Sequence, residues 1–396
     1  ARNSQKENRH MRITDIREFT LHTGEKRSNA VMDFSDMTTG FVAVITDVIR
    51  DGKPVVGYGF SGSGRYSQNA ICRERLIPRL LAAKPEDLVN EAGDNFDPFR
   101  VWDCMMQKEK PGGHGDRAIA VATIDMAIWD AAAKIAEEPL HTFLSKRYGT
   151  GQVPDEVFVY VGGGYYTGGN GYSALQDEMR RYLDDGFTVI KIKGAGAPLD
   201  EDLRRIEAVL EVLPANQLAI DANGRFRLED AVTFAKAIQP YGLRWLEEPG
   251  YPLDYDLQAE IARIYDGPLA TGECLLSSWD AMNLLRYGGL RQDRDILQFD
   301  CALSYGICEY IRTIAIMEKM GWSRDSLYPH GGHLLSLHIT AGLGLGGTEV
   351  YPYTHQPIGG FTDGLQITNG RVALPQLPGL GFEGKANLKQ VLEGMV

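Results

Sequence analysis

The chain has 396 residues, which is too long for one ordinary small core and suits two domains or one large barrel with a cap. Apolar residues make up 43% and charged residues 24%, so the composition excludes disordered and fibrous proteins. A net charge of −12 with no basic block argues against a nucleic-acid or anionic-membrane partner, and no run of 18 apolar residues is present to span a bilayer.

The first part of the chain, residues 11–150, predicts an α+β domain. Ile13–Leu21 and Gly40–Ile49 have the pattern of strands, and a helical block that includes Ala118–Ile135 follows them. Gly57–Gly64 lacks the Lys-Ser/Thr ending of a phosphate-binding loop, so we interpret it as a flexible lid.

From residue 151 onward, eight short apolar runs alternate with amphipathic helical stretches. The runs are Val157–Val161, Thr188–Lys193, Leu218–Asp221, Leu243–Glu247, Leu269–Glu273, Ile296–Asp300, Ser326–His330 and Thr348–Pro352. This alternation favours an α/β fold, a (β/α)8-type TIM barrel over residues 151–363, although periodicity alone leaves an open sheet as an alternative. The tail is rich in glycine and proline, and we expect residues 364–396 to return and complete the capping domain.

Polar residues recur at the ends of these runs, 26 to 30 residues apart. They are Lys193, Asp221, Glu247, Glu273, Asp300 and His330. Each step advances one strand around the barrel at the same height, at the carboxyl ends where such barrels place their active sites.

Asp221, Glu247 and Glu273 are predicted to converge from neighbouring strands. Three carboxylates at one height repel each other unless a cation lies between them, and hard oxygen ligands favour Mg²⁺. A salt bridge to a nearby Lys or Arg explains any one of these acids alone, but not three at nearly equal spacing.

Lys191 and Lys193 alternate along one strand, so both side chains point into the barrel mouth. We expect the like charge to lower the pKa of Lys193 and make it a base, while Lys191 binds a substrate carboxylate. On neighbouring strands, Asp300 is placed to orient the ring of His330. Asn223 is either a substrate contact or a turn former, and the sequence favours neither.

A base and a second acid/base group beside a divalent ion indicate proton abstraction next to a carboxylate, with the enediolate charge stabilised by the cation. With these features the sequence resembles the mandelate racemase branch of the enolase superfamily over residues 11–396. Four closer motifs are similar to those of D-tartrate dehydratases in that branch: Glu109–Gly115 (EKPGGHG), Asp221–Phe226 (DANGRF), Phe299–Gly306 (FDCALSYG) and Pro329–His333 (PHGGH).

The resemblance implies a Mg²⁺-dependent dehydratase that converts D-tartrate into oxaloacetate and water. It implies that Lys193 takes the C2 proton and that His330, oriented by Asp300, protonates the departing C3 hydroxyl. Glu349 resembles an acid that hydrogen-bonds the substrate carboxylate, and Lys110 a cap residue that meets the far carboxylate. Cap loops at Thr23–Thr38 and Gly57–Gln68 resemble the segments that set specificity.

Three alternatives stay open: an acid-sugar dehydratase, racemase or epimerase on the same scaffold, a Schiff-base aldolase, and a non-catalytic binding protein. The expected partner is a small hydroxy-acid substrate, and such capped barrels often form homo-oligomers. The five cysteines are odd in number and form no Cys-x-x-Cys pair, so we expect a reducing, cytoplasmic location.

Overall fold

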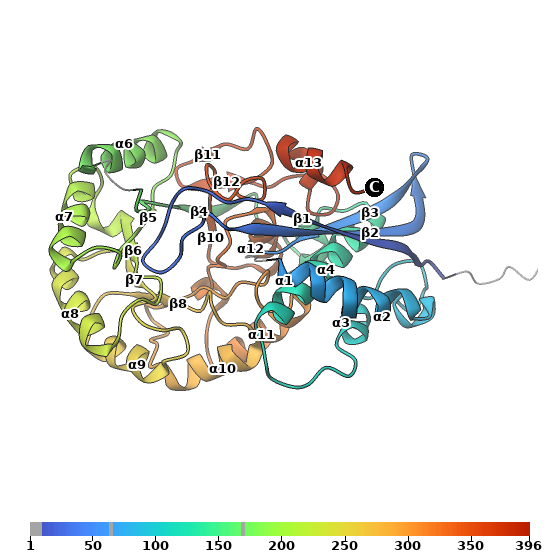
Figure 1. Cartoon of the computed structure of the whole chain (residues 1–396), viewed down its shortest axis with the longest axis horizontal. Coiled ribbons are helices and arrows are strands. Elements are labelled where there is room, and N and C mark those ends of the chain that lie inside the picture. The colour runs from blue at the N-terminus through green and yellow to red at the C-terminus, as the bar shows by residue number, and fades with distance from the viewer. Residues whose placement is uncertain (1–9, 63–65, 168–170) are drawn as a thin grey trace, which may run out of the picture.

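The computed structural model describes residues 10–62, 66–167 and 171–396, and it has the predicted α/β class: a parallel barrel with an α+β cap (Figure 1). The end of the Gly57–Gly64 segment, part of the loop up to Gln68 and residues 1–9 lie outside the described residues. Among the described residues, no helix combines the length and the apolar character needed to cross a membrane.

The cap begins with a three-stranded antiparallel sheet in the order β1-β2-β3. Its strands are β1 (Ile13–His22), β2 (Thr38–Arg50) and β3 (Lys53–Phe60). The central strand β2 is buried through its first nine residues, as expected for a strand covered on both sides.

Within the described part of the cap, five α-helices follow the sheet. They are α1 (Ser67–Ile71), α2 (Ile77–Ala82), α3 (Pro98–Met105), α4 (Asp116–Ile135) and α5 (Leu140–Tyr148). The long helix α4 packs on β3, where a Cβ at Gly57 would lie 2.0 Å from the carbonyl oxygen of Ala127 and one at Gly59 2.0 Å from that of Thr123. These glycines therefore allow a helix to approach a strand, and the interpretation of residues 57–60 as part of a flexible lid is wrong.

In the described residues the barrel contains seven parallel strands. They are β4 (Glu156–Gly163), β5 (Ile190–Lys193), β6 (Leu218–Asp221), β7 (Trp245–Glu247), β8 (Leu269–Thr271), β9 (Ile296–Leu297) and β10 (Thr348–Val350). Lys193 pairs with Asp221, and Asp221 pairs with Glu247. This register places the three strand ends at one height, as the spacing of the polar residues predicts.

The position between β9 and β10 is filled by an irregular segment, so the strand predicted over Ser326–His330 is wrong in extent. A single parallel bridge joins Leu327 to Leu297, and β10 closes the ring by pairing with β4. Pro329 has no backbone N–H to donate, which explains why a longer ladder does not form there.

Over residues 171–343, seven α-helices surround the barrel. They are α6 (Gly171–Asp184), α7 (Leu199–Leu210), α8 (Leu228–Ile238), α9 (Tyr255–Ile264), α10 (Ser278–Tyr287), α11 (Ile307–Lys319) and α12 (Leu334–Leu343). The apolar faces of α6 to α9 pack on the outside of the strands in one hydrophobic cluster. Helices α10 and α11 share the core of the cap, and α12 contributes residues to both clusters.

After the barrel, a short hairpin of β11 (Ile367–Thr368) and β12 (Arg371–Ala373) pairs with β4, and the chain then runs to the cap and ends in α13 (Ala386–Glu393). The backbone N–H of Leu380 donates to buried Asp130 on α4 at 2.7 Å. The C-terminal segment is therefore tied to the cap by a charge-assisted hydrogen bond as well as by packing.

Inside the barrel, a small apolar layer lies below the polar strand ends. It consists of Tyr160, Val189, Ala219, Trp245 and Ala270. Because strand side chains alternate, residues two positions further along each strand point into the same interior, nearer the mouth. The fold thus presents an apolar floor with charged groups above it.

Candidate active site

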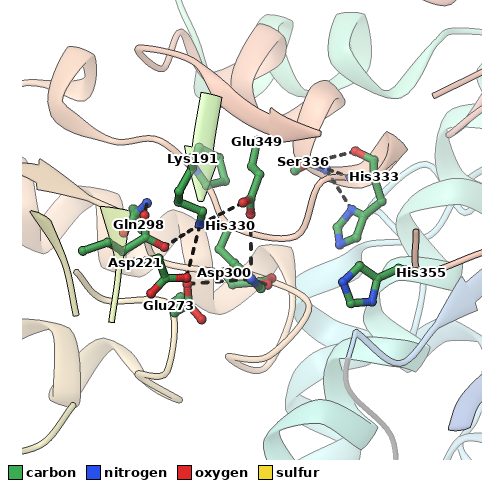
Figure 2. Close-up of polar contacts among 12 residues, drawn as sticks. Lys191, Asp221, Glu273, Gln298, Asp300, His330, His333, Ser336, Glu349 and His355 are labelled. Atoms are coloured by element: carbon green, nitrogen blue, oxygen red, sulfur yellow. Dashed lines mark hydrogen bonds and ion pairs between the residues drawn. The ribbon is translucent and has the colours of Figure 1, made fainter. Parts of the chain in front are cut away.

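The structure brings the three predicted metal-ligating carboxylates together. One oxygen each of Asp221, Glu247 and Glu273 lies within 4.8 Å of the others, and all three residues are buried. Figure 2 shows Asp221 and Glu273 side by side. They project from the ends of β6 and β7 and from just beyond β8, in the register described above.

This group fits a hard divalent cation. Burial raises the pKa of Glu247 to about 8, and the nearby charges of Asp221 and Glu273 contribute to the rise, against the opposing effect of Lys191. Oε2 of Glu273 is buried without a hydrogen-bond partner among the described residues. A cation held by these oxygens would remove both the mutual repulsion and the unpaired acceptor, and an all-carboxylate set matches the preference of Mg²⁺.

Lys191 lies at the centre of the carboxylates rather than at their edge. Its Nζ is 2.5 Å from Glu247, 2.8 Å from Glu349 on β10 and 3.8 Å from Asp221. Burial alone lowers the pKa of this ammonium, but the surrounding carboxylates hold it well above its usual value. Lys191 is therefore a fixed positive charge beside the three acids, and it connects them to Glu349.

Lys193 forms an ion pair with Asp221, with Nζ 2.6 Å from Oδ2. Burial and the neighbouring Lys191 lower the pKa of Lys193, yet Asp221 and other anionic neighbours raise it more, so the net pKa lies above the ordinary value. The expectation of a pKa lowered by like charge is thus wrong for the arrangement in this structure. A cation bound to Asp221 would compete with Lys193 for the same oxygen and would favour the neutral amine.

On the other side of the carboxylates, His330 meets Asp300 as predicted. Nδ1 of His330 lies 2.8 Å from Asp300, and Nε2 faces Glu273 at 3.7 Å and Glu349 at 3.8 Å (Figure 2). Burial lowers the pKa of His330, but these carboxylates outweigh it and raise the pKa to about 10. The contact at Nδ1 fixes the ring and leaves Nε2 directed at the carboxylate group.

Of the two remaining predicted residues, one lies at the site and the other does not. Asn223 lies at the site, because its backbone N–H and its Nδ2 both donate to Asp221, at 2.8 and 2.9 Å. Its Oδ1 is buried without a hydrogen-bond partner among the described residues. Lys110 lies elsewhere: its side chain is exposed on the loop before α4, and its carbonyl accepts from Arg117 at 3.0 Å.

Sequence reasoning missed two residues that hold Glu247. Trp245 Nε1 donates to Glu247 Oε2 at 2.9 Å, and Gln298 Nε2 donates to the same oxygen at 2.8 Å and to Tyr160 at 3.2 Å. The signal that could have found them is the alternation used for Lys191 and Lys193. Trp245 is two positions before Glu247, and Gln298 is two before Asp300, so each points into the barrel.

Comparisons with known proteins agree with this architecture. Residues 17–145 match the mandelate racemase / muconate lactonizing enzyme N-terminal domain, and residues 174–387 match the family described as enolase C-terminal domain-like. An arabinonate dehydratase of Saccharolobus solfataricus is 28% identical over 380 residues, which is 93% of this chain and 96% of the relative.

Two solved structures extend the likeness. A racemase from Streptomyces coelicolor with bound magnesium has a TM-score of 0.76 at 25% identity, over 95% of this chain and 99% of the other. An L-talarate dehydratase from Polaromonas sp. JS666, complexed with Mg and L-glucarate, has a TM-score of 0.73 at 25% identity, over 95% and 97%. On these matches the chain belongs to the mandelate racemase and muconate lactonizing enzyme branch of the enolase superfamily.

Proposed function

We propose that the chain is a Mg²⁺-dependent dehydratase of a hydroxy acid, with D-tartrate as the substrate and oxaloacetate and water as the products. The observation that carries this proposal is the placement of two proton-transfer groups around the carboxylates. Lys193 contacts Asp221 on one side, and His330 faces Glu273 on the other. Removal of a proton from one carbon and of a hydroxyl from the next requires such a base and acid.

Asp221, Glu247 and Glu273 would hold the Mg²⁺ ion. When bound, the ion stabilises the negative charge that develops on the substrate carboxylate as the C2 proton leaves. Lys191 adds a fixed positive charge beside the same position, and the free Oδ1 of Asn223 is available as an acceptor for a substrate hydroxyl.

The residues of the chain account for the proton movements. The neutral amine of Lys193 takes the proton from C2, which leaves an enediolate. Nε2 of His330 then donates its proton to the C3 hydroxyl, the C3–O bond breaks and water departs. Asp300 keeps the ring oriented throughout, because its contact at Nδ1 leaves only Nε2 free for proton transfer. The enol product tautomerises to oxaloacetate.

Acid-sugar dehydration is supported by the names of the relatives, including arabinonate dehydratase and L-talarate/galactarate dehydratase. The test is to incubate the protein and Mg²⁺ with both tartrate enantiomers, arabinonate, galactonate and galactarate, and to measure keto-acid formation. D-Tartrate should be the best substrate. Preferred turnover of a sugar acid would refute the tartrate proposal and leave the dehydratase proposal standing, whereas no keto acid from any of them would refute both.

A racemase or epimerase is the second candidate, because a structural relative is named as a racemase and the same Lys and His pair can exchange a proton on both faces of one carbon. The two functions differ in D₂O. A racemase incorporates deuterium at C2 and returns the other stereoisomer, whereas a dehydratase forms the keto acid.

A further inference from the structure

The loop between β1 and β2, residues 23–37, carries a cap residue to the barrel mouth. Figure 1 shows this blue loop extending from the cap across the barrel strands. Ser28 exchanges backbone hydrogen bonds with Tyr166, which follows β4: the N–H of Ser28 donates at 3.3 Å and the N–H of Tyr166 donates at 3.0 Å. The loop is therefore fixed against the end of a barrel strand.

Arg27, one residue before Ser28, has a buried side chain with open donors. The side chain is 7% exposed, and its guanidinium lies 4.3 Å from the ring centre of Tyr165 and 4.9 Å from that of Phe34. Neither Nε nor Nη1 makes a hydrogen bond to another described residue. Glu25 Oε2 approaches Nε to 2.8 Å, without the alignment of a hydrogen bond.

A buried guanidinium with unpaired N–H donors favours the binding of an anion. Its five N–H groups form a fork that matches a carboxylate, and buried donors that stay unpaired cost stability. A cavity of about 10 Å³ adjoins Arg27, with Thr39, His355 and Ile358 also in its wall. That is room for one water molecule, which a carboxylate oxygen could replace.

The ring of Tyr165 relates the position of Arg27 to that of Lys193, the proposed base. Lys193 Nζ lies 5.2 Å from the same ring centre that Arg27 contacts at 4.3 Å, so the two cations cannot be further apart than these two distances together. His355 provides a second link. Its Nε2 is 3.4 Å from the Tyr165 hydroxyl, and burial, together with the positive charges of Arg27, His330 and Lys193, holds the pKa of His355 well below its ordinary value.

This upper limit on the separation favours a short diacid over a longer one. The proton donor carbon of a substrate sits about 3–3.5 Å from the base, and a carboxylate accepts from a guanidinium at about 2.7–2.9 Å. The upper limit on the separation of the two cations therefore leaves space between these contacts for no more than about the two carbon–carbon bonds that separate C2 from C4. The two carboxyl carbons of a four-carbon diacid are three bonds apart, about 3.8 Å when extended, as are consecutive Cα atoms.

We propose that Arg27 binds the substrate carboxylate that is farther from the metal-ligating acids, and that it selects dicarboxylic over monocarboxylic hydroxy acids. The inference rests on the proposed function, because it presumes a hydroxy acid bound beside Asp221 and Lys193. It assigns to Arg27 the role that sequence resemblance gave to Lys110, whose exposed side chain lies on the loop before α4. The anion already beside this guanidinium is Glu25, whose Oε2 lies 2.8 Å from Nε and whose Oε1 accepts from the His355 N–H at 2.7 Å.

A matched pair of ligands tests the proposal directly. Malate and 2-hydroxybutanoate have the same four-carbon chain and the same α-hydroxy acid, but only malate has the second carboxylate. With the α-hydroxy acid end at the metal-ligating acids, neither has the C3 hydroxyl needed for dehydration, and the malate sample is checked for loss of water after each titration. Binding of each to the full-length protein with Mg²⁺ is measured by calorimetry. The variants are Arg27→Gln, the exposed neighbour Lys26→Gln as the matched loss of charge, and Lys110→Gln for the rival residue.

The wild type should bind malate on the order of 10- to 100-fold more tightly than 2-hydroxybutanoate, as expected for hydrogen bonds to a charged group. Arg27→Gln should abolish this preference by weakening the binding of malate but not that of 2-hydroxybutanoate. Lys26→Gln and Lys110→Gln should keep the preference. Should Arg27→Gln fail to fold, Arg27→Met offers a long apolar side chain that can pack between the same rings, and the same loss is expected.

A preference for malate that survives in the Arg27 variants would overturn the proposal. The proposal would also be overturned if Lys110→Gln lost the preference for malate while Arg27→Gln kept it. A wild type that binds both acids equally would overturn it too, while leaving the proposed dehydratase intact. A wild type that binds neither acid with Mg²⁺ would instead contradict the proposed function, and the inference with it.

Discussion

Replacement of Lys193 by alanine should separate catalysis from metal binding. General-base catalysis contributes about 10²- to 10⁴-fold, so turnover should fall by at least that factor, or about 3–5 kcal/mol of barrier. The affinity for Mg²⁺, in contrast, should stay the same or rise. Lys193 Nζ lies 2.6 Å from Asp221 Oδ2 and competes with a cation for that oxygen.

The size of this competition can be worked from the contact. A hydrogen bond to a charged group contributes about 1.5–3 kcal/mol, which corresponds to about a 10- to 100-fold change in an equilibrium constant. Loss of the ammonium also removes a like charge from the cation site. Lys193→Ala should therefore bind Mg²⁺ as tightly as the wild type or up to about 100-fold more tightly.

The assay measures keto-acid formation from the best substrate, and Mg²⁺ affinity by calorimetry, for the wild type and Lys193→Ala. Lys319→Ala, which removes an exposed lysine at the end of α11, is the control and should leave both quantities unchanged. Turnover within about tenfold of the wild type in Lys193→Ala would refute the assignment of the base, because general-base catalysis contributes more than that. Mg²⁺ binding that weakens in parallel with turnover would show instead that Lys193 supports the metal site.

Three further predictions follow from individual contacts. Glu247→Gln should weaken Mg²⁺ binding at least about tenfold in a calorimetric titration, since it removes a ligand charge, and saturating Mg²⁺ should restore part of the turnover. Asp300→Asn should lower the pKa of His330, because it removes the carboxylate that contacts Nδ1, and the basic limb of the pH–rate profile should move down by about one to two pH units. An unmoved limb would mean that His330 is not the acid. Asp125→Asn should raise thermal stability at high pH. Burial raises the pKa of Asp125 from 3.8 to about 7, so as the pH rises the unfolded state loses this proton before the folded state does. The free energy of unfolding of the wild type should therefore fall by up to about 4 kcal/mol between pH 4 and pH 7. Asparagine still accepts from the Ile307 N–H, and in thermal melts the gain should shrink toward zero near pH 4.

Much of the site could be predicted because barrel strands repeat one local pattern. A buried run that ends in a polar residue predicts where that side chain lies, since each strand ends at the same edge of the barrel. The spacing of Asp221, Glu247 and Glu273 along the chain is therefore enough to predict that their side chains converge. The fold class follows from the same alternation of runs and helices, and Mg²⁺ follows from the hard oxygen ligands of the set.

Where the prediction failed, the decisive contacts join segments far apart in the chain. Gly57 has the local signature of a flexible loop, yet α4, which lies some 70 residues later, packs against it and requires the missing Cβ. Likewise, a Lys-x-Lys pair in isolation implies mutual lowering of pKa values, but the carboxylate of Asp221 from the next strand reverses the net effect on Lys193.

The sequence by itself determined the elements, their order around the barrel and the acids at the strand ends, because these depend on short-range periodicity and on residue chemistry. Only the tertiary structure decided which cap cation reaches the mouth. Arg27 and Lys110 are both basic residues in loops, and nothing in their local sequence separates them. The backbone pairing of Ser28 with Tyr166 draws one of them over the barrel, and the other stays exposed on its own loop, because the docking of a loop depends on surfaces that form only when the chain has folded.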